Sequence, residues 1–458
     1  MSFRLYLLYV FMTFFRPVEM WAPDMAAYRP MLTLSVLCLG LSLLNIRKEH
    51  AVAARKIHYQ LFFGFCAIMM LSQLANGFGI DGALQAFNEF SPSIMLFTLT
   101  TLNVNTVDRV RKTSIATIIG LIFAAYYSIN AYHTGDRADE LVMRQKAPEH
   151  DLDDIAQAPP VDAPADYQYD WFVFRIRSLS ILSDPNDFAQ AMVMTLPMII
   201  GLYRHGAHLR NLIILGGPIS IFLYAISLTQ SRGARLGIAA ALGVGAIKVL
   251  GWKRTLIGAM VVAFLFVAGS ISSSGGREIT VKDKSSEDRI LSWAAGVEML
   301  KSRPVFGVGY GHFTEHNEAN MSLTAHNSFV LCFSELGVSG YLIWLGLITL
   351  AIKGANRGAE IVEKNSPAYF MSMMMTTGIT GFFVCAWFLS RTYQPTLYFM
   401  LGLCVASWHI CWHNRTEQHR DEPEPQIAWG KTSLIAALAL FTIVNGFILY
   451  QEMGAGGE

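Results

Sequence analysis

The sequence predicts an all-α, polytopic membrane protein, and two observations support this prediction. The chain of 458 residues is 53% hydrophobic and only 15% charged, whereas an average soluble domain carries about 25% charged residues. Mainly apolar runs of roughly 17–25 residues, the length that crosses a bilayer as a helix, recur along the whole chain. The net charge of +1 excludes a bulk field that would attract nucleic acid.

About 12–13 transmembrane helices are expected. The first run is the weakest, because Arg16 and Pro17 interrupt it, and it is expected to cross, to re-enter or to lie in the interface. The six cysteines fall inside apolar runs without metal-ligand spacing, so we expect them to be buried hydrophobes and expect no metal site. The predicted helices cover residues 4–21, 31–46, 58–76, 91–107, 113–131, 185–203, 210–229, 235–251, 254–271, 327–352, 368–390, 394–412 and 432–450.

Lysine and arginine are distributed unequally over the loops between these runs. If the N-terminus is cytoplasmic, the inside loops carry most of the cations, and the positive-inside rule then favours this orientation. An odd number of spans places the C-terminus outside. The outside short loops hold only Arg29, Arg232, Arg235 and Arg391.

Two long loops then face outward and divide the chain. The middle of the first loop, 147–166, is acidic and rich in proline and alanine, and we expect it to be mobile. The predicted divisions are N-terminal transmembrane helices 1–131, an acidic loop 132–184, the transmembrane helices of a second half 185–271, an ordered loop 272–326 and C-terminal transmembrane helices 327–458.

The second loop is expected to contain a helix. Ser285 and Asp288 resemble a capping box, and apolar residues then recur at helical spacing from Ile290 to Leu300. Pro304 is expected to end this helix, and the glycines of GVGYG (307–311) to form a flexible turn. These glycines follow no predicted strand, which argues against a nucleotide-binding loop.

Arg232 and Arg235 lie in a very short outside turn between two apolar runs. Arginine close to the membrane boundary is costly unless it has a partner or a function. A guanidinium binds phosphate or diphosphate through two parallel hydrogen bonds. The pair is therefore a candidate phosphate clamp, and the alternative is that both side chains extend to lipid headgroups.

Further candidates lie in the second loop and just after it. Arg289 opens the predicted helix and could face the same outer cavity, or it could be a solvated surface residue. His326 precedes an apolar run, where it could act as a general base or only as an interfacial or capping residue. Glu335 follows nine positions later, on the opposite helical face, so we expect it to bond a neighbouring helix. Other candidates are His312 and His316 as rival bases, and Arg235, Asn327, Tyr310 and His312 as substrate-binding residues.

Four segments resemble the O-antigen ligase and O-antigen polymerase superfamily of bacterial envelope glycosyltransferases. They span residues 180–350 in order and spacing. They are SDPNDFAQAMVMTLP (183–197), QSRGARLG (230–237), DRILSWAAGVEMLKSRPVFGVGYGHF (288–313) and TAHNSFVLCFSELGVSGYLIW (324–344).

The resemblance implies a GT-C-like membrane enzyme of the bacterial inner membrane with a periplasmic catalytic face. Members transfer a glycan from an undecaprenyl diphosphate carrier to a glycan, lipid A–core or protein acceptor, without cofactor, metal or nucleotide sugar. The family's functional arginines fall on Arg232 and Arg289, and its essential histidine on His326. Two departures are the apparent thirteenth span, 432–450, and the long acidic loop, 132–184.

The resemblance leaves the individual activity open. It fits an O-antigen ligase, a repeat-unit polymerase or a protein O-oligosaccharyltransferase. A transporter or flippase of lipid-linked glycan is the alternative from another class. A transporter needs a site that both faces of the membrane can reach, whereas the polar candidates here cluster on the outer face and Glu335 is the main exception.

Overall fold

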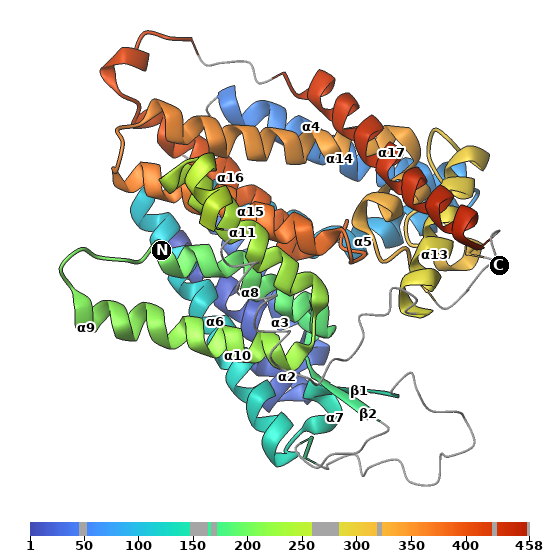
Figure 1. Ribbon diagram of the computed structural model, residues 1–458, viewed down its shortest axis with the longest axis horizontal. Coiled ribbons are helices and arrows are strands. Elements are labelled where there is room, and N and C mark those ends of the chain that lie inside the picture. Colours follow the sequence, from blue (N-terminus) through green and yellow to red (C-terminus); the bar gives the residue numbers. More distant parts are fainter. Residues whose placement is uncertain are drawn as a thin grey trace.

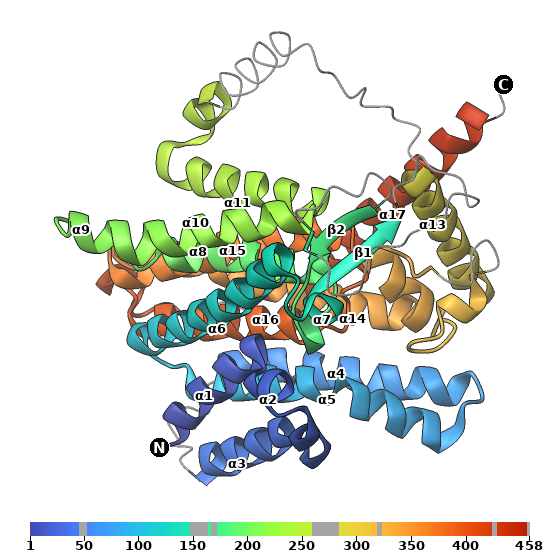
Figure 2. The same cartoon turned by 90° about the horizontal axis from the view of Figure 1, so that it is seen from below.

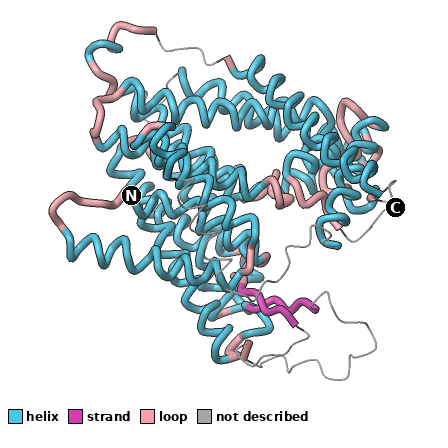
Figure 3. The backbone as a smooth tube through the Cα atoms, in the orientation of Figure 1, coloured by secondary structure: helices cyan, strands magenta, loops and turns pink. Residues whose placement is uncertain are grey.

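The computed structural model describes residues 1–44, 53–146, 164–165, 172–258, 284–317, 323–423 and 428–455. Helices make up most of this part of the chain (Figures 1 and 3). Eight of the described helices are long and apolar enough to cross a membrane. The predicted all-α polytopic architecture is therefore confirmed.

The chain begins with two short apolar helices joined by a bent connection. Helix α1 (Ser2–Phe15) ends at Arg16, whose left-handed backbone (φ 61°) breaks the helix before α2 (Pro17–Trp21). A 3-10 helix, η1 (Pro23–Tyr28), leads into α3 (Pro30–Leu44). A helix of 14 residues such as α1 rises only about 21 Å, less than the ~30 Å of bilayer hydrocarbon. The first predicted span is therefore a broken helix.

Three long helices follow, α4 (Ala53–Ala75), α5 (Gly79–Asn103) and α6 (Val107–Thr134). The prediction that a span starts at residue 91 is wrong in its boundary, because α5 begins at Gly79 and continues through Pro92. The connection from α4 to α5 is correspondingly short.

A small sheet that the sequence analysis did not predict follows α7 (Ala138–Leu141). Strands β1 (Val142–Lys146) and β2 (Phe172–Ile176) pair antiparallel, with Val142 opposite Ile176. Figure 3 shows these strands in magenta at one end of the helical bundle. Of the segment 147–166 that we expected to be mobile, only residues 164 and 165 are described.

The remaining helices form the rest of the bundle. The predicted span 254–271 lies outside the described residues beyond residue 258. Pro304 follows the end of α13, as predicted, whereas the side chain of Ser285 is not described. The elements are η4 (Ser180–Leu182), α8 (Pro185–Ile200), α9 (His208–Asn211), the π-helix η5 (Leu212–Gly216), α10 (Gly217–Thr229), α11 (Arg232–Leu250), α13 (Lys284–Ser302), η6 (Thr314–His316), α14 (Ser328–Ile361), α15 (Pro367–Ala386), α16 (Pro395–His413), η7 (Glu417–His419) and α17 (Trp429–Ala455).

Burial separates the core helices from those at the periphery. In the apolar part of α16, 94% of the residues are buried, compared with 17% in α11 and 22% in α17. Figure 2 shows α1–α5 on one side of the bundle, α10 and α11 on the other, and α14, α15 and α16 between them. An apolar helix that the protein leaves exposed is suited to contact lipid, so α11 and α17 are peripheral and α16 is central.

Helix α14 is interrupted at Gly337, whose backbone is left-handed and non-helical (φ 64°). The segment after α13 forms backbone hydrogen bonds with α14 at this interruption. The amides of Val308 and Gly309 donate to the carbonyls of Ser334 and Glu335, at 3.0 Å each. The amide of Val338 donates back to the Pro304 carbonyl at 2.8 Å. The predicted flexible turn at 307–311 is therefore a segment whose first residues are fixed by backbone pairing.

Candidate active site

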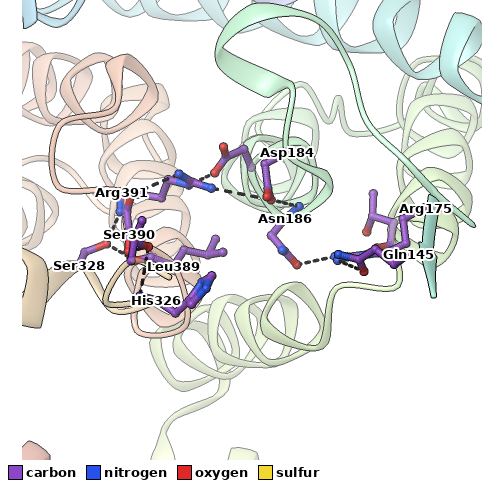
Figure 4. A network of polar contacts seen from close by, with 12 residues as sticks. Gln145, Arg175, Asp184, Asn186, His326, Ser328, Leu389, Ser390 and Arg391 are labelled. Atoms are coloured by element: carbon purple, nitrogen blue, oxygen red, sulfur yellow. Dashed lines mark hydrogen bonds and ion pairs between the residues drawn. The ribbon is translucent and has the colours of Figure 1, made fainter. Parts of the chain in front are cut away.

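The candidate site lies where the starts of α8 and α14 meet the connection between α15 and α16 (Figure 4). Asp184 caps α8 by accepting the Asn186 amide at 2.7 Å, and Asn327 caps α14 by accepting the amides of Phe329 and Val330 at 2.9 and 3.2 Å. Helix N-termini carry partial positive charge and favour anions. The side chains of Asp184 and Asn327 therefore already satisfy the first amides of α8 and α14.

His326 is positioned by its neighbours along the chain. Its own backbone is left-handed (φ 46°), and the preceding carbonyl, that of Ala325, accepts the Trp293 indole N–H of α13 at 2.9 Å. Since Asn327 provides the cap of α14, His326 is not the capping residue. Asn327 is buried, and its amide oxygen is used within the fold, so its predicted contact with substrate stays a prediction.

The charges around His326 favour its neutral form. Burial lowers the pKa of the imidazole below 6.5, the cations Arg289 and Arg391 lower it further, and Asp184 opposes them. A histidine that is neutral near pH 7 can accept a proton. Arg289 and His326, two residues predicted from the sequence, thus lie close enough for the charge of Arg289 to lower the pKa of the histidine.

Arg391 belongs to this group, although the sequence analysis counted it only as an outside cation. Its guanidinium forms ion pairs with Asp187 and, at 3.7 Å, with Asp184, both from the start of α8. Its amide donates to the Ser328 hydroxyl at 2.8 Å, and that hydroxyl donates to the Leu389 carbonyl at 2.6 Å. The signal that selected Arg232, a serine–arginine pair in a short outside turn, is also present at Ser390–Arg391.

Arg175 of β2 connects the small sheet to the site. Its guanidinium donates to the Thr229 carbonyl at the end of α10 and to the Asn186 side chain, both at 2.8 Å. Burial lowers its pKa, with Asp184 opposing and Arg289 adding to the effect. The sheet therefore holds together the start of α8 and the turn that precedes α11.

Arg232 and Arg235 lie in the first turn of α11, and both are exposed. Ser231 caps this helix by accepting the Ala234 amide at 3.3 Å. A Cβ placed on Gly233 would lie 3.5 Å from Phe388, and Phe388 directly precedes the Leu389–Arg391 segment. The turn with Arg232 is thus packed beside the connection that carries Arg391.

The other predicted residues form a second group around α4 and α5. Tyr310 packs edge-on against Tyr393 at 4.6 Å between ring centroids, and its carbonyl accepts the Gln73 amide at 2.7 Å. His312 stacks on Phe78 at 3.8 Å, and its Nδ1 lies 2.8 Å from a Glu315 carboxylate oxygen. His312 and its neighbour His316, whose Nδ1 lies 3.0 Å from the His312 carbonyl, have contacts that differ from those of His326, and a role for either stays a prediction.

Glu335 is buried in α14 and accepts the Phe313 amide at 3.1 Å. The expected bond to a neighbouring helix is therefore replaced by one to the segment that follows α13. The Glu335 carboxylate thus holds the segment that hydrogen-bonds to α14 at its interruption. This is a structural role, as we expected for Glu335.

Residues 218–345 match the sequence model of a family described as O-antigen ligase. The chain carries an O-antigen ligase domain. This domain begins in α10 and ends in α14, so it contains Arg232, Arg289 and His326, whereas Asp184 and Arg391 lie outside it. No curated protein matches the chain. The predicted resemblance to the superfamily is confirmed.

The O-antigen ligase domain fixes the general class of the protein. Together with the eight apolar helices, it identifies a multi-pass membrane protein with an O-antigen ligase-like function in polysaccharide biosynthesis. The family is one of glycosyltransferases and ligases, so the chain is assigned to an enzyme class.

Proposed function

We propose that the chain transfers a glycan from undecaprenyl diphosphate to an acceptor hydroxyl at the periplasmic face of the bacterial inner membrane. The observation that supports this most is the grouping of neutral His326 with Arg289 and Arg391 at the start of α14, where the O-antigen ligase domain meets the rest of the bundle. A base beside fixed cations is the combination that this reaction needs.

The arginines would act on the leaving group. When the bond between the sugar C1 and the diphosphate oxygen breaks, the diphosphate takes the electron pair and gains negative charge. Guanidinium groups already in place stabilise that charge without reorganisation during the reaction. We assign this role to Arg232 and Arg289, because the charge of Arg391 is already compensated by its ion pairs with Asp184 and Asp187.

His326 would act on the acceptor. As the acceptor oxygen forms the new glycosidic bond, its proton passes to the neutral imidazole, a step typically worth about 10²–10⁴-fold in rate. The residues assigned here provide both charge neutralisation and proton removal. The acceptor is a glycan, lipid A–core or a protein, and glycan profiles of a deletion strain separate these cases: loss of attachment with retained long lipid-linked chains identifies a ligase, and products with a single repeat unit identify a polymerase.

The substitution His326→Asn tests this function directly. Turnover of a defined lipid-linked donor in liposomes is expected to fall about 10²–10⁴-fold while donor affinity is kept, because asparagine cannot accept the proton. His208→Asn, at an exposed site in α9, is the matched control and should keep wild-type turnover. Near-normal turnover of His326→Asn would exclude the base, and equal loss of donor binding would assign His326 to holding diphosphate.

The same assay separates the enzyme from a transporter. The wild-type protein should form a new glycosidic bond with purified donor and acceptor. Movement of the lipid-linked donor across the bilayer without any new bond would contradict the proposal and favour a flippase.

A further inference from the structure

A second cationic cavity lies beside the broken N-terminal helix and is lined by none of the candidate site residues. Its volume is about 270 Å³. The polar part of the wall contains Arg16 and Glu19 from the break between α1 and α2, and Arg29 from the start of α3. Met31, Met95 and Ile181 contribute to the apolar part. The lining of the cavity thus combines charged and apolar side chains.

The charged groups leave this cavity with an excess of positive charge. Arg16 donates to Glu19 at 2.9 Å, and the Arg16 side chain is only 13% exposed. The Nε of Arg16 is buried and has no hydrogen-bond partner in the described part of the chain. Arg29 adds a second cation, so the charged residues that line the cavity are two arginines and one glutamate.

Both arginines occupy backbone positions that favour glycine. Arg16 has φ 61° and Arg29 has φ 49°, in the left-handed region. A non-glycine residue pays roughly 1–2 kcal/mol in this conformation. The backbone conformation therefore gives no preference for arginine at either position.

The chain between Glu19 and Arg29 is suited to a membrane interface. Trp21, Met25 and Tyr28, on the short connection that carries the cavity's charges, are 60%, 56% and 78% exposed. Tryptophan and tyrosine prefer the level of the lipid headgroups. The segment that carries these exposed side chains thus also carries two of the charged residues that line the cavity, Glu19 and Arg29.

We propose that this cavity binds the phosphate-bearing headgroup of an amphiphilic lipid. The guanidinium of Arg16 donates an N–H to a phosphate oxygen, Arg29 contacts the same phosphate, and the first carbons of the tails lie against the methionines and Ile181. Guanidinium groups bind phosphate oxygens through strong charge-assisted hydrogen bonds. The site is distinct from the candidate active site, and lipid binding there requires no glycan transfer.

Retention of dioleoyl phosphatidate by the purified full-length protein in neutral detergent tests the proposal. The wild-type protein should retain this lipid at least about tenfold better than the double variant Arg16→Gly/Arg29→Gly, a change that removes both cations while suiting the left-handed backbone. Arg137→Gly is the matched control, because Arg137 is also left-handed (φ 58°) and pairs with Glu140 at 3.3 Å outside the cavity. It should retain lipid as the wild type does.

Two further probes separate the parts of the ligand. Dioleoylglycerol, which has the tails without the phosphate, should be retained at least about tenfold less than phosphatidate, and equimolar inorganic phosphate should not displace the phosphatidate. Equal retention of phosphatidate by the double variant, or equal loss in Arg137→Gly, would overturn the proposal. Displacement by inorganic phosphate would also overturn it in favour of a free phosphate site. If the double variant does not fold, phosphatidate retention is measured with the single variant Arg29→Gly, which changes an exposed position. The same outcomes then support or overturn the proposal.

Discussion

His326 is held in place by the backbone on both sides of it. Trp293 bonds the carbonyl before it, and Asn327 caps the helix after it. The imidazole ring is therefore not required to hold the loop together. This arrangement allows the ring to change its protonation state without loss of the local fold, which suits a residue that takes up and releases a proton in each turnover.

The pH dependence of transfer should report this histidine. Because burial and the cations Arg289 and Arg391 lower its pKa, the acid limb of the rate should lie at lower pH than it would for a histidine of ordinary pKa. The variant Arg391→Gln loses one of these cations, and the negative charge of Asp184 near the ring is then less compensated. The pKa of His326 should therefore rise, and the acid limb should move to higher pH. Profiles of kcat/KM against pH for both proteins provide the measurement, and an unchanged acid limb in the variant would contradict the arrangement.

Lysine substitutions should distinguish the diphosphate clamp from a simple need for charge. Arg232→Lys and Arg289→Lys keep the cation but lose the fork that binds two oxygens, so each should lose a large part of transfer, about tenfold or more, at normal protein level. Arg235→Lys, one turn further along α11, should be milder. Full activity of both Arg232→Ala and Arg289→Ala would exclude the clamp.

At the scale of elements, α14 depends on a close approach between two backbones. A Cβ on Gly337 would lie 2.5 Å from the Val305 carbonyl carbon, at the point where the segment after α13 enters the interruption. Ser72 of α4 donates to the carbonyls of Phe306 and Glu335, at 2.8 and 3.0 Å, and so closes the same junction from the other side. Helix α4, helix α14 and the segment after α13 thus meet at this junction, which has no space for a side chain at position 337.

Gly337→Ala should therefore be strongly destabilising. Gly311→Ala is the matched control, because Gly311 is also left-handed (φ 79°) but a Cβ there would meet nothing within 4 Å. The control should show only the left-handed penalty of about 1–2 kcal/mol, and Gly337→Ala should lose clearly more, because neighbouring backbone must move. Thermal unfolding in detergent measures both, and equal effects would show that the approach is not tight.

At the scale of the whole molecule, the connections lie at two ends of the bundle. The sheet and α13 lie at the right in Figure 1, and the start of α1 and α9 lie toward the left. We propose that the right-hand end is periplasmic, as the distribution of lysine and arginine indicates. The proposed transfer at the periplasmic face depends on this orientation.

Thiol labelling should establish the orientation. In a cysteine-free background, Glu315→Cys should react with an impermeant reagent in cells whose outer membrane has been permeabilised, and Lys364→Cys should not; both positions are exposed. The background is needed because six native cysteines exist, although all are buried. Protection of Glu315→Cys with labelling of Lys364→Cys would reverse the orientation.

The helices could be predicted because a membrane imposes a strong pattern on sequence. Long apolar runs gave the existence and order of the described helices, but not the start of α5, since the first turns of that helix carry Asp81 and Glu89 and resemble a loop. Strands β1 and β2 were missed because five residues each, without clear alternation, carry little signal.

The candidate site was only partly predictable for a different reason. Arg289 and His326 were selected because each is unusual at its place in the chain. The ion pairs of Arg391 with Asp184 and Asp187 join residues that are about 200 positions apart in the sequence. Packing of α8 against α15 brings these residues together. Pairing over such separations is a property of the fold, and no local pattern contains it.

The burial of α16 has a consequence for how the protein is made. This helix packs against α5, α14 and α15 and is almost entirely enclosed, and its Gly402 lies against Thr100 of α5, a residue synthesised about 300 positions earlier. The helices made before α16 therefore lack this packing partner until α16 has been inserted. The interior of the bundle can be completed only after the whole of α16, which ends at His413, has left the ribosome.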